Sequence, residues 1–282
     1  MRVWQMIGVV AWLGCAWAAS AYEVISGSAQ QGALLIGRVA PGSRILFDGA
    51  AVRVTPTGEF VIGFDRDAKP RASLVEIDPD GKRHAHVLAV QLRQYQIQRV
   101  NGVPQETVEP PLAQLERIAA DQRLVEAARA VNSDRLDFLS TFRWPLLGPI
   151  SGVYGSQRIY NGVPGRPHFG VDVAAPVGTP VRAPAAAVVT LAHPDLFFSG
   201  GTLIMDHGYG VSSTFMHLSR LLVNVGDVVQ AGQVVAEVGA TGRATGPHLD
   251  WRLNWLNVRI DPQLEVEPMP PQAAAPAAAP AK

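Results

Sequence analysis

The stretch Pro167-His168-Phe169-Gly170-Val171-Asp172 places an imidazole and a carboxylate four positions apart, in a segment with the composition of a β-strand. Side chains at positions i and i+4 of a strand project from the same face. We therefore expect His168 and Asp172 to lie in one strand and to converge on a single ion.

Two further segments carry side chains of the same kind. Gly246-Pro247-His248-Leu249-Asp250-Trp251 contains a histidine and an aspartate two positions apart, which again share one face of a strand. Thr214-Phe215-Met216-His217-Leu218-Ser219 adds a third histidine. We expect these three separated segments to meet at one site.

The composition around these segments favours an all-β domain. From residue 141 the chain is rich in glycine, proline and valine, and no amphipathic helix interrupts its short β segments. We expect an antiparallel β-sandwich over residues 141–264. Its expected strands are Val181–Ala183, Ala187–Ala192, Thr202–Asp206, Val211–His217, Gln233–Val238 and His248–Leu253.

A smaller β domain is expected over residues 22–104. Its short runs of β-branched residues are separated by turn signals at Asp48-Gly49, Thr57-Gly58 and Asp80-Gly81. Strands at this spacing predict a small immunoglobulin-like sandwich. The expected strands are Ala33–Val39, Ser43–Phe47, Ala51–Val54, Phe60–Phe64, Ser73–Ile77 and His86–Leu92.

A helical linker is expected between the two domains, over residues 105–140. Within it, apolar residues recur with a helical period directly after Pro110-Pro111, which predicts a helix over Leu112–Val131. The tail, residues 265–282, is mostly alanine and proline and is expected to be disordered.

The first 21 residues have the pattern of a secretory signal peptide. Met1-Arg2 supplies the charge, Val3–Trp17 the apolar run and Ala19-Ser20-Ala21 the small residues of a cleavage site. We expect export, with cleavage after Ala21. The alternative is a lipid anchor at Cys15, but Trp12 stands where such a signal has an aliphatic residue.

The charge balance excludes one class of partner. Lysine plus arginine equals aspartate plus glutamate, at 24 each, so no strong electrostatic field attracts nucleic acid. Binding must come from local shape and from the chemistry of the site.

The residues before His168 are predicted to form a long loop over Ser156–Pro167. Loops of this length in a compact domain are often functional. Tyr160 could donate a hydrogen bond to an oxyanion, and Arg158 and Arg166 could hold a peptide carboxylate. The alternatives are an aromatic residue that fixes the loop and solvated surface charges.

The remaining histidines are expected to be structural. His207 lies in the turn Asp206-His207-Gly208, and His193 lies in a surface loop. His84 and His86 are two positions apart, but they have no third ligand in register and are expected on a solvated strand face.

The order of these motifs resembles a known family. His-x-x-x-Asp, Asp206-His207-Gly208, Phe-Met-His217-Leu-Ser and Gly-Pro-His248-x-Asp250-Trp follow one another as in the LytM-type zinc endopeptidases of peptidase family M23. The resemblance covers Phe142 to about Leu264. It implies a zinc cleft in the second domain and activity on bacterial cell-wall peptides.

The resemblance implies a role for each site residue. His168 and Asp172 are the first two zinc ligands, and His217 and His248 flank the metal, where they orient the attacking water and manage its proton. The family has a second histidine at the third ligand position, where this sequence has Asp250.

A carboxylate can replace an imidazole as a zinc ligand. However, two carboxylates neutralise the divalent ion, which should weaken its effect on a bound water. The alternative is that Asp250 pairs with Arg252 or with solvent, and that the metal is lost.

By this resemblance we expect one Zn²⁺ per chain and hydrolysis of the peptide cross-links between peptidoglycan stems, with the D-alanyl to diaminopimelate bond as the default. The lack of a recognisable wall-targeting module favours a Gram-negative periplasm and leaves room for a periplasmic regulator. The sequence does not fix the oligomeric state. The alternative function is that of a degenerate domain that binds cell wall or activates another murein hydrolase.

Overall fold

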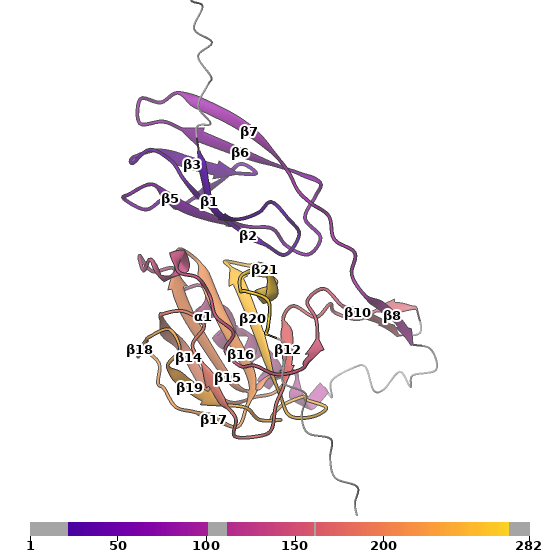
Figure 1. The fold of residues 1–282 in the computed structure, drawn as a ribbon. Helices are drawn as coiled ribbons and strands as arrows, with labels where there is room; N and C mark the ends of the chain where they lie inside the picture. Colours follow the sequence, from indigo (N-terminus) through magenta and orange to yellow (C-terminus); the bar gives the residue numbers. More distant parts are fainter. Residues whose placement is uncertain (1–21, 101–111, 161, 271–282) are drawn as a thin grey trace, which may run out of the picture.

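The computed structural model describes residues 22–100, 112–160 and 162–270. The predicted signal segment and residues 271–282 of the predicted disordered tail lie outside these residues. Residues 265–270, the start of that tail, are ordered instead, because Glu265 accepts a hydrogen bond from Leu34 N and the carbonyl of Glu267 accepts one from Trp144. The described chain is mostly β, with one α-helix, as the sequence predicts (Figure 1).

The N-terminal part consists of two antiparallel sheets, which face each other in Figure 1. One has the order β1-β2-β5 (Glu23–Gly27, Leu34–Arg38, Glu59–Gly63) and the other the order β4-β3-β6-β7 (Ala50–Val52, Arg44–Phe47, Arg71–Ile77, Arg83–Ala89). The side chains of Ile45, Phe60, Ile62 and Leu74 are fully buried in their core. The immunoglobulin-like topology of this part stays a prediction.

An eight-stranded sheet dominates the C-terminal part, with the order β18-β14-β15-β16-β20-β12-β9 and β21 paired with β20. A three-stranded sheet, β13-β19-β17, accompanies it. The strands are β9 (Ile150–Gly152), β12 (Val171–Ala174), β13 (Pro180–Arg182), β14 (Ala187–Leu196), β15 (Gly200–Gly208), β16 (Val211–Leu218), β17 (Arg220–Leu221), β18 (Val228–Val229), β19 (Val234–Glu237), β20 (His248–Trp255) and β21 (Val258–Ile260).

Strand β15 is buried along its whole length because both of its faces are covered. Ile204 packs against Ala128 of helix α1 (Leu115–Arg129), whereas its neighbours Leu203 and Met205 belong to the main hydrophobic core. The predicted helix is thus confirmed, preceded by a short 3₁₀ turn at Leu112–Gln114. Neither α1 nor any other helix in the described ranges has the length and apolarity needed to cross a membrane.

The two parts of the chain share one continuous core. Phe47 of the N-terminal part packs against Trp255 of β20, with ring centroids 6.1 Å apart. An ion pair joins half-buried Arg93 to buried Asp261, with 2.8 Å between Nη2 and Oδ2. β8 (Ile97–Val100) pairs in parallel with β10 (Gln157–Tyr160), so the end of the N-terminal part is tied to the segment that precedes His168.

Two sequence-based expectations were wrong in this region. Ser156–Pro167 is not a simple loop, because β10 and β11 (Val163–Pro164) form a hairpin within it. His168 does not share a strand with Asp172, because β12 begins only at Val171. The backbone of His168 instead bonds to the preceding segment: its N–H donates to Ser156 O and its carbonyl accepts from Gly155 N, each at 2.8 Å.

The junction between the two parts is expected to lose stability as pH rises. Glu265 accepts a hydrogen bond from Leu34 N at 2.9 Å, and burial raises the pKa of its carboxyl from 4.5 to about 7. The folded protein keeps this proton where the unfolded chain has lost it, so stability falls between pH 4.5 and pH 7. The thermal midpoint of Glu265→Gln should therefore fall less from pH 5 to pH 8 than that of the native protein. Exposed Glu267→Gln is the matched control, and equal pH slopes for all three proteins would contradict the expectation.

Candidate metal centre

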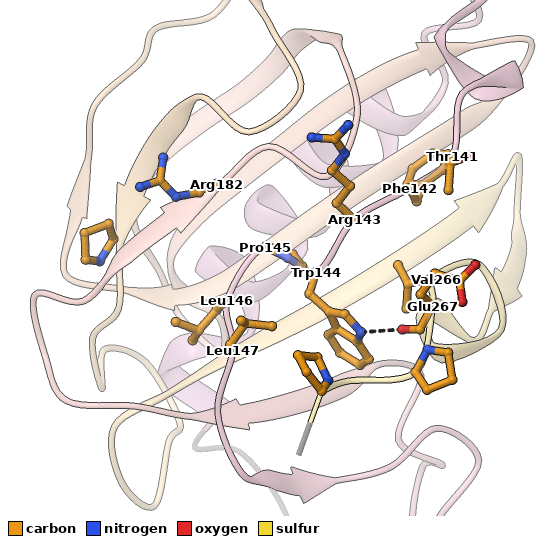
Figure 2. Close-up of a pocket in the computed structure, with 13 residues that line it drawn as sticks. Thr141, Phe142, Arg143, Trp144, Pro145, Leu146, Leu147, Arg182, Val266 and Glu267 are labelled. Atoms are coloured by element: carbon orange, nitrogen blue, oxygen red, sulfur yellow. Dashed lines mark hydrogen bonds between the residues drawn. The ribbon is translucent and has the colours of Figure 1, made fainter. Parts of the chain in front are cut away.

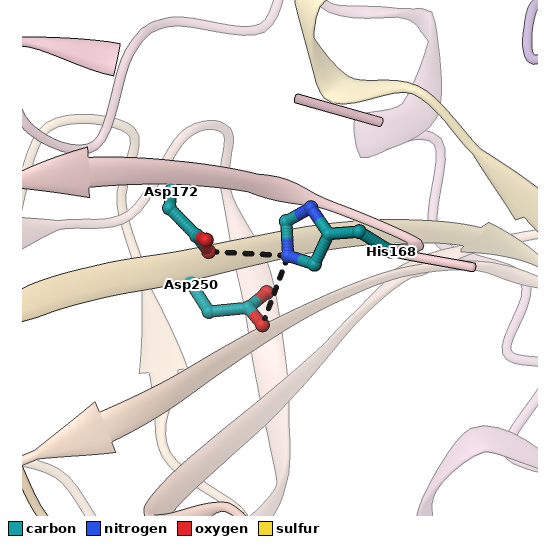
Figure 3. A group of neighbouring side chains, drawn as sticks. All are labelled: His168, Asp172 and Asp250. Atoms are coloured by element: carbon teal, nitrogen blue, oxygen red, sulfur yellow. Dashed lines mark hydrogen bonds and ion pairs between the residues drawn. The ribbon is translucent and has the colours of Figure 1, made fainter. Parts of the chain in front are cut away.

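One imidazole and two carboxylates converge where β12 pairs with β20 (Figure 3). His168 Nε2 lies 3.1 Å from Asp172 Oδ1 and 3.4 Å from Asp250 Oδ2. The three potential ligand atoms all lie within 4.8 Å of one another. This is the only group of at least three such side chains found among the described residues.

The strand register explains why residues 78 positions apart in sequence meet. β12 and β20 are antiparallel, and Asp172 lies directly opposite Asp250. Two glycines leave room for these carboxylates. A Cβ at Gly152 would lie 2.1 Å from Asp172 Oδ2, and one at Gly170 would lie 2.7 Å from Asp250 Oδ1.

Asp250 is also held by an arginine from its own strand. Arg252 Nε donates to Asp250 Oδ1 at 2.9 Å and Arg252 Nη2 donates to Oδ2 at 2.7 Å. Burial on its own would raise the pKa of Asp250, but the charge and hydrogen bonds of Arg252, together with His168, lower it, so the carboxylate is ionised. The pairing that the sequence offered as an alternative therefore exists, and it leaves Asp250 beside His168.

The electrostatics of the group suit a cation. Burial alone lowers the pKa of His168, but Asp172 and Asp250 raise it to about 10. Asp172 Oδ1 is buried and accepts no well-formed hydrogen bond within the described part of the chain. Each carboxylate oxygen has two lone pairs, so Asp250 Oδ2 can bind both Arg252 and an ion. One nitrogen and two oxygen ligands with room for water or substrate fit an open site for zinc.

Two further histidines lie beside this group. The rings of His217 and His248 have centroids 4.8 Å apart, and His248 Nε2 lies 3.9 Å from Asp172 Oδ1. His217 Nδ1 donates to Thr241 O and His248 Nδ1 donates to Gly246 O, each at 2.8 Å. Carbonyl oxygens only accept hydrogen bonds, so each neutral ring keeps its proton on Nδ1 and leaves Nε2 free to accept one.

His217 also has an unusual backbone. Its φ of 64° lies in the left-handed region, which is rare for residues other than glycine. Such conformations are often found at functional sites. Burial lowers the pKa of His217, which favours its neutral form near pH 7.

The three residues expected to bind substrate are not all brought to the candidate metal centre. Arg158 donates to Gln98 Oε1 at 3.1 Å, so it ties β10 to β8. Arg166 is exposed. The side chain of Tyr160 lies outside what the structure describes, so its role as an oxyanion donor stays a prediction.

The other histidines have structural partners, but two of them do not lie where the sequence predicts them. His207 lies in β15 rather than in a turn, and His193 lies in β14 rather than in a loop, where its Nδ1 accepts from Asp195 N at 3.2 Å. His207 is fully buried, with Nδ1 2.8 Å from Ala186 O and Nε2 2.7 Å from Ser213 Oγ. His84 Nε2 is 2.8 Å from Asp78 Oδ2, and the His86 ring packs edge-on against Tyr22.

Removing His207 is expected to affect stability rather than chemistry. His207→Ala leaves a cavity and the buried hydroxyl of Ser213 without its partner, which should lower the free energy of unfolding by about 2–4 kcal/mol. Chemical denaturation measures this loss, and the rate per folded molecule should be unchanged. His193→Ala on β14 serves as a control, and a stability of His207→Ala equal to that of the native protein would contradict the structural role.

A pocket of about 540 Å³ lies elsewhere on the domain (Figure 2). It is lined by Trp144, Leu146, Leu147 and the segment Val266–Pro268, and Trp144 Nε1 donates to Glu267 O at 2.8 Å. Trp144 packs against Trp251, whose side chain points to the opposite face of β20 from Asp250. The pocket is therefore separate from the candidate metal centre.

Comparison with known proteins agrees with this geometry. The sequence profile of Peptidase family M23 matches residues 166–262, which include all five histidines and aspartates of the centre. A Pseudomonas aeruginosa crystal structure assigned to peptidase M23 has a TM-score of 0.65 and 29% identity, and it covers 85% of this chain and 95% of that one. Residues 166–262, which contain the candidate metal centre, thus match the metallopeptidase family M23.

Curated relatives match over the same domain. Peptidoglycan DD-endopeptidase ShyB of Vibrio cholerae is 38% identical over 97 residues, which are 34% of this chain and 22% of ShyB. DD-carboxypeptidase/endopeptidase Mpg of Neisseria meningitidis is 38% identical over 105 residues, which are 37% of this chain and 24% of Mpg. The matched segment thus spans less than a quarter of the length of either relative.

Sequence reasoning found the five side chains at the centre and named the pairing of Asp250 with Arg252 as an alternative, but it missed the groups that hold the two flanking histidines. The carbonyls of Thr241 and Gly246, which fix the two flanking histidines, carry no signal in their residue types. The contact between Arg252 and Asp250 could be predicted from the sequence, because residues two positions apart in a strand project from the same face.

Proposed function

We propose that this protein is a zinc-dependent endopeptidase that hydrolyses the peptide cross-links of bacterial peptidoglycan. The observation that carries this proposal is the convergence of His168, Asp172 and Asp250 beside two histidines whose Nε2 atoms are free to accept a proton. The substrate class is supported by ShyB and Mpg, which are named as endopeptidases and match over the same domain.

Three residues would bind the metal and two histidines would transfer protons. When bound, zinc would polarise a peptide carbonyl and acidify a water. His168, Asp172 and Asp250 hold the ion. His248, close to Asp172, and neutral His217 are placed to orient the water and to accept its proton through Nε2, and the protonated ring can then donate to the leaving amine.

The location follows from the substrate. Peptidoglycan lies outside the cytoplasmic membrane, so we infer an extracytoplasmic protein, and the pattern of residues 1–21 supports export. A Gram-negative periplasm is the compartment that we propose. Peptidoglycan stems are the partner, and a periplasmic regulator is a further candidate.

A second function is favoured by one observation, the ion pair between Arg252 and Asp250. If that pair displaced the metal, the domain would bind cell wall or activate another murein hydrolase.

Digestion of purified peptidoglycan, with separation of the released fragments, tests the two functions against each other. The first predicts cross-link cleavage that a chelator stops and zinc restores. Binding to peptidoglycan without cleavage, at any zinc concentration, would support the second function.

A further inference from the structure

The side chain of Arg252 bonds to Asp250, the proposed third zinc ligand. Its guanidinium forms a two-pronged contact with both oxygens of Asp250, at 2.9 and 2.7 Å. In the described part of the chain the guanidinium donates to no other acceptor. Bidentate pairs of this kind fix orientation as well as adding energy. The side chain of Asp250 is only 4% exposed, so this orientation is set in a largely dry environment.

The surrounding strands are built to accommodate the pair. A Cβ at Gly170 would lie 2.7 Å from Arg252 Cγ and equally close to Asp250 Oδ1. Arg252 is opposite Thr214 of β16, on the same face of the sheet as Asp250, while Trp251 between them is fully buried on the other face. The pair therefore occupies a fixed place between the His168 segment and β16.

The pair changes the charge of the centre. Asp172 and Asp250 together carry −2, which would neutralise a divalent ion completely. Many catalytic zinc sites use two neutral imidazoles and one carboxylate, which leaves a net charge of +1. Adding the permanent charge of Arg252 to zinc and two carboxylates also gives +1.

We propose that Asp250 and Arg252 act as one ligand unit, in which the guanidinium orients the carboxylate toward the metal and offsets its charge, so that the pair takes the place of a neutral ligand. Arg252 is thus a positioning residue. This inference rests on the proposed zinc-dependent function and specifies how Asp250 can serve as the third ligand.

Other arginines lie near but do not share this role. Arg129 and Arg259 are close enough to Arg252 for their charges to interact. Arg259 donates to Asn254 Oδ1 at 3.3 Å and does not contact a ligand. Arg259→Met therefore removes a nearby charge without touching the pair, and it is the matched control.

Zinc affinity of the metal-free protein, measured by competition with a chromogenic chelator, tests the proposal. Arg252→Met should weaken zinc binding about 10- to 100-fold, the range for residues that orient a ligand. Arg252→Lys keeps the charge and should recover part of the loss, and Arg259→Met should stay within a few-fold of native. Arg252→Gln replaces the methionine variant if that protein does not fold.

A double variant, Asp250→His with Arg252→Met, distinguishes charge compensation by Arg252 from a purely structural role. Asp250→His alone places an imidazole beside an unpaired arginine and should weaken zinc binding. Adding Arg252→Met to Asp250→His should then strengthen it, because the uncompensated charge is removed.

Native affinity in Arg252→Met, or weaker binding when Arg252→Met is added to Asp250→His, would overturn the proposal. If the native protein itself binds no zinc, the proposed function fails first, and the two failures are thereby distinguished.

Discussion

Replacing His248 with alanine is expected to slow peptidoglycan cleavage about 100- to 10,000-fold, the range for loss of a positioned acid–base group, while zinc remains bound. The reason is geometric. His248 does not belong to the ligand group, yet its Nε2 lies 3.9 Å from Asp172 Oδ1 and its Nδ1 is fixed on Gly246 O. The rate of peptidoglycan cleavage checks the loss of activity, and the zinc content of the same preparation checks that the metal stays bound.

His217→Ala should behave in the same way, because its ring lies beside that of His248 with a centroid distance of 4.8 Å. His193→Ala, which removes a histidine from β14, is the control and should retain native turnover. Full activity in His248→Ala would contradict its assignment. Loss of zinc from His248→Ala would show instead that this histidine binds the metal.

Replacing Asp172 with asparagine is expected to remove both metal and activity. Asp172 Oδ1 has no well-formed hydrogen bond among the described residues, and it lies between the Nε2 atoms of His168 and His248. Losing this charged ligand should cost more zinc affinity than the 10- to 100-fold typical of an outer-shell partner. Elemental analysis of the purified variant measures the bound zinc.

The fold of Asp172→Asn should be retained, since asparagine has nearly the same shape and β12 is held by backbone pairing with β20 and β9. Exposed Asp80→Asn, in an N-terminal turn, is the control for a general effect of removing an aspartate. A zinc content in Asp172→Asn equal to that of the native protein would place the metal elsewhere.

Much of the fold follows from local signals. Short runs of β-branched residues between glycine turns predict β2, β3, β5 and the long strands β14, β15, β16 and β20. A helical period after two prolines predicts α1. These elements could be predicted because their residue types and their neighbours along the chain favour the same structure.

The elements that were missed depend on distant partners. β8 and β10 pair in parallel although 60 positions separate Ile97 from Gln157, and neither segment has a strong strand pattern. His168 lies outside β12 because its backbone bonds to Ser156 and Gly155, a contact that no spacing rule reveals. The conclusion that His168 and Asp172 converge was nonetheless correct, because the imidazole, although outside the strand, lies 3.1 Å from the carboxylate.

The site shows the same division. The motif order around His168, His217 and His248 predicted which side chains meet. The sequence could not show how Asp250, which stands where the family has a histidine, is oriented. The structure shows that its carboxylate pairs with Arg252 and still faces His168.

The most direct test of this account is the zinc content of the purified native protein, combined with digestion of purified peptidoglycan. We predict close to one zinc per chain and cleavage of peptide cross-links that stops on chelation and returns with added zinc. A protein that holds no zinc and cleaves nothing even with zinc added would contradict the account, and Asp250 with Arg252 would then mark a site that has lost its metal.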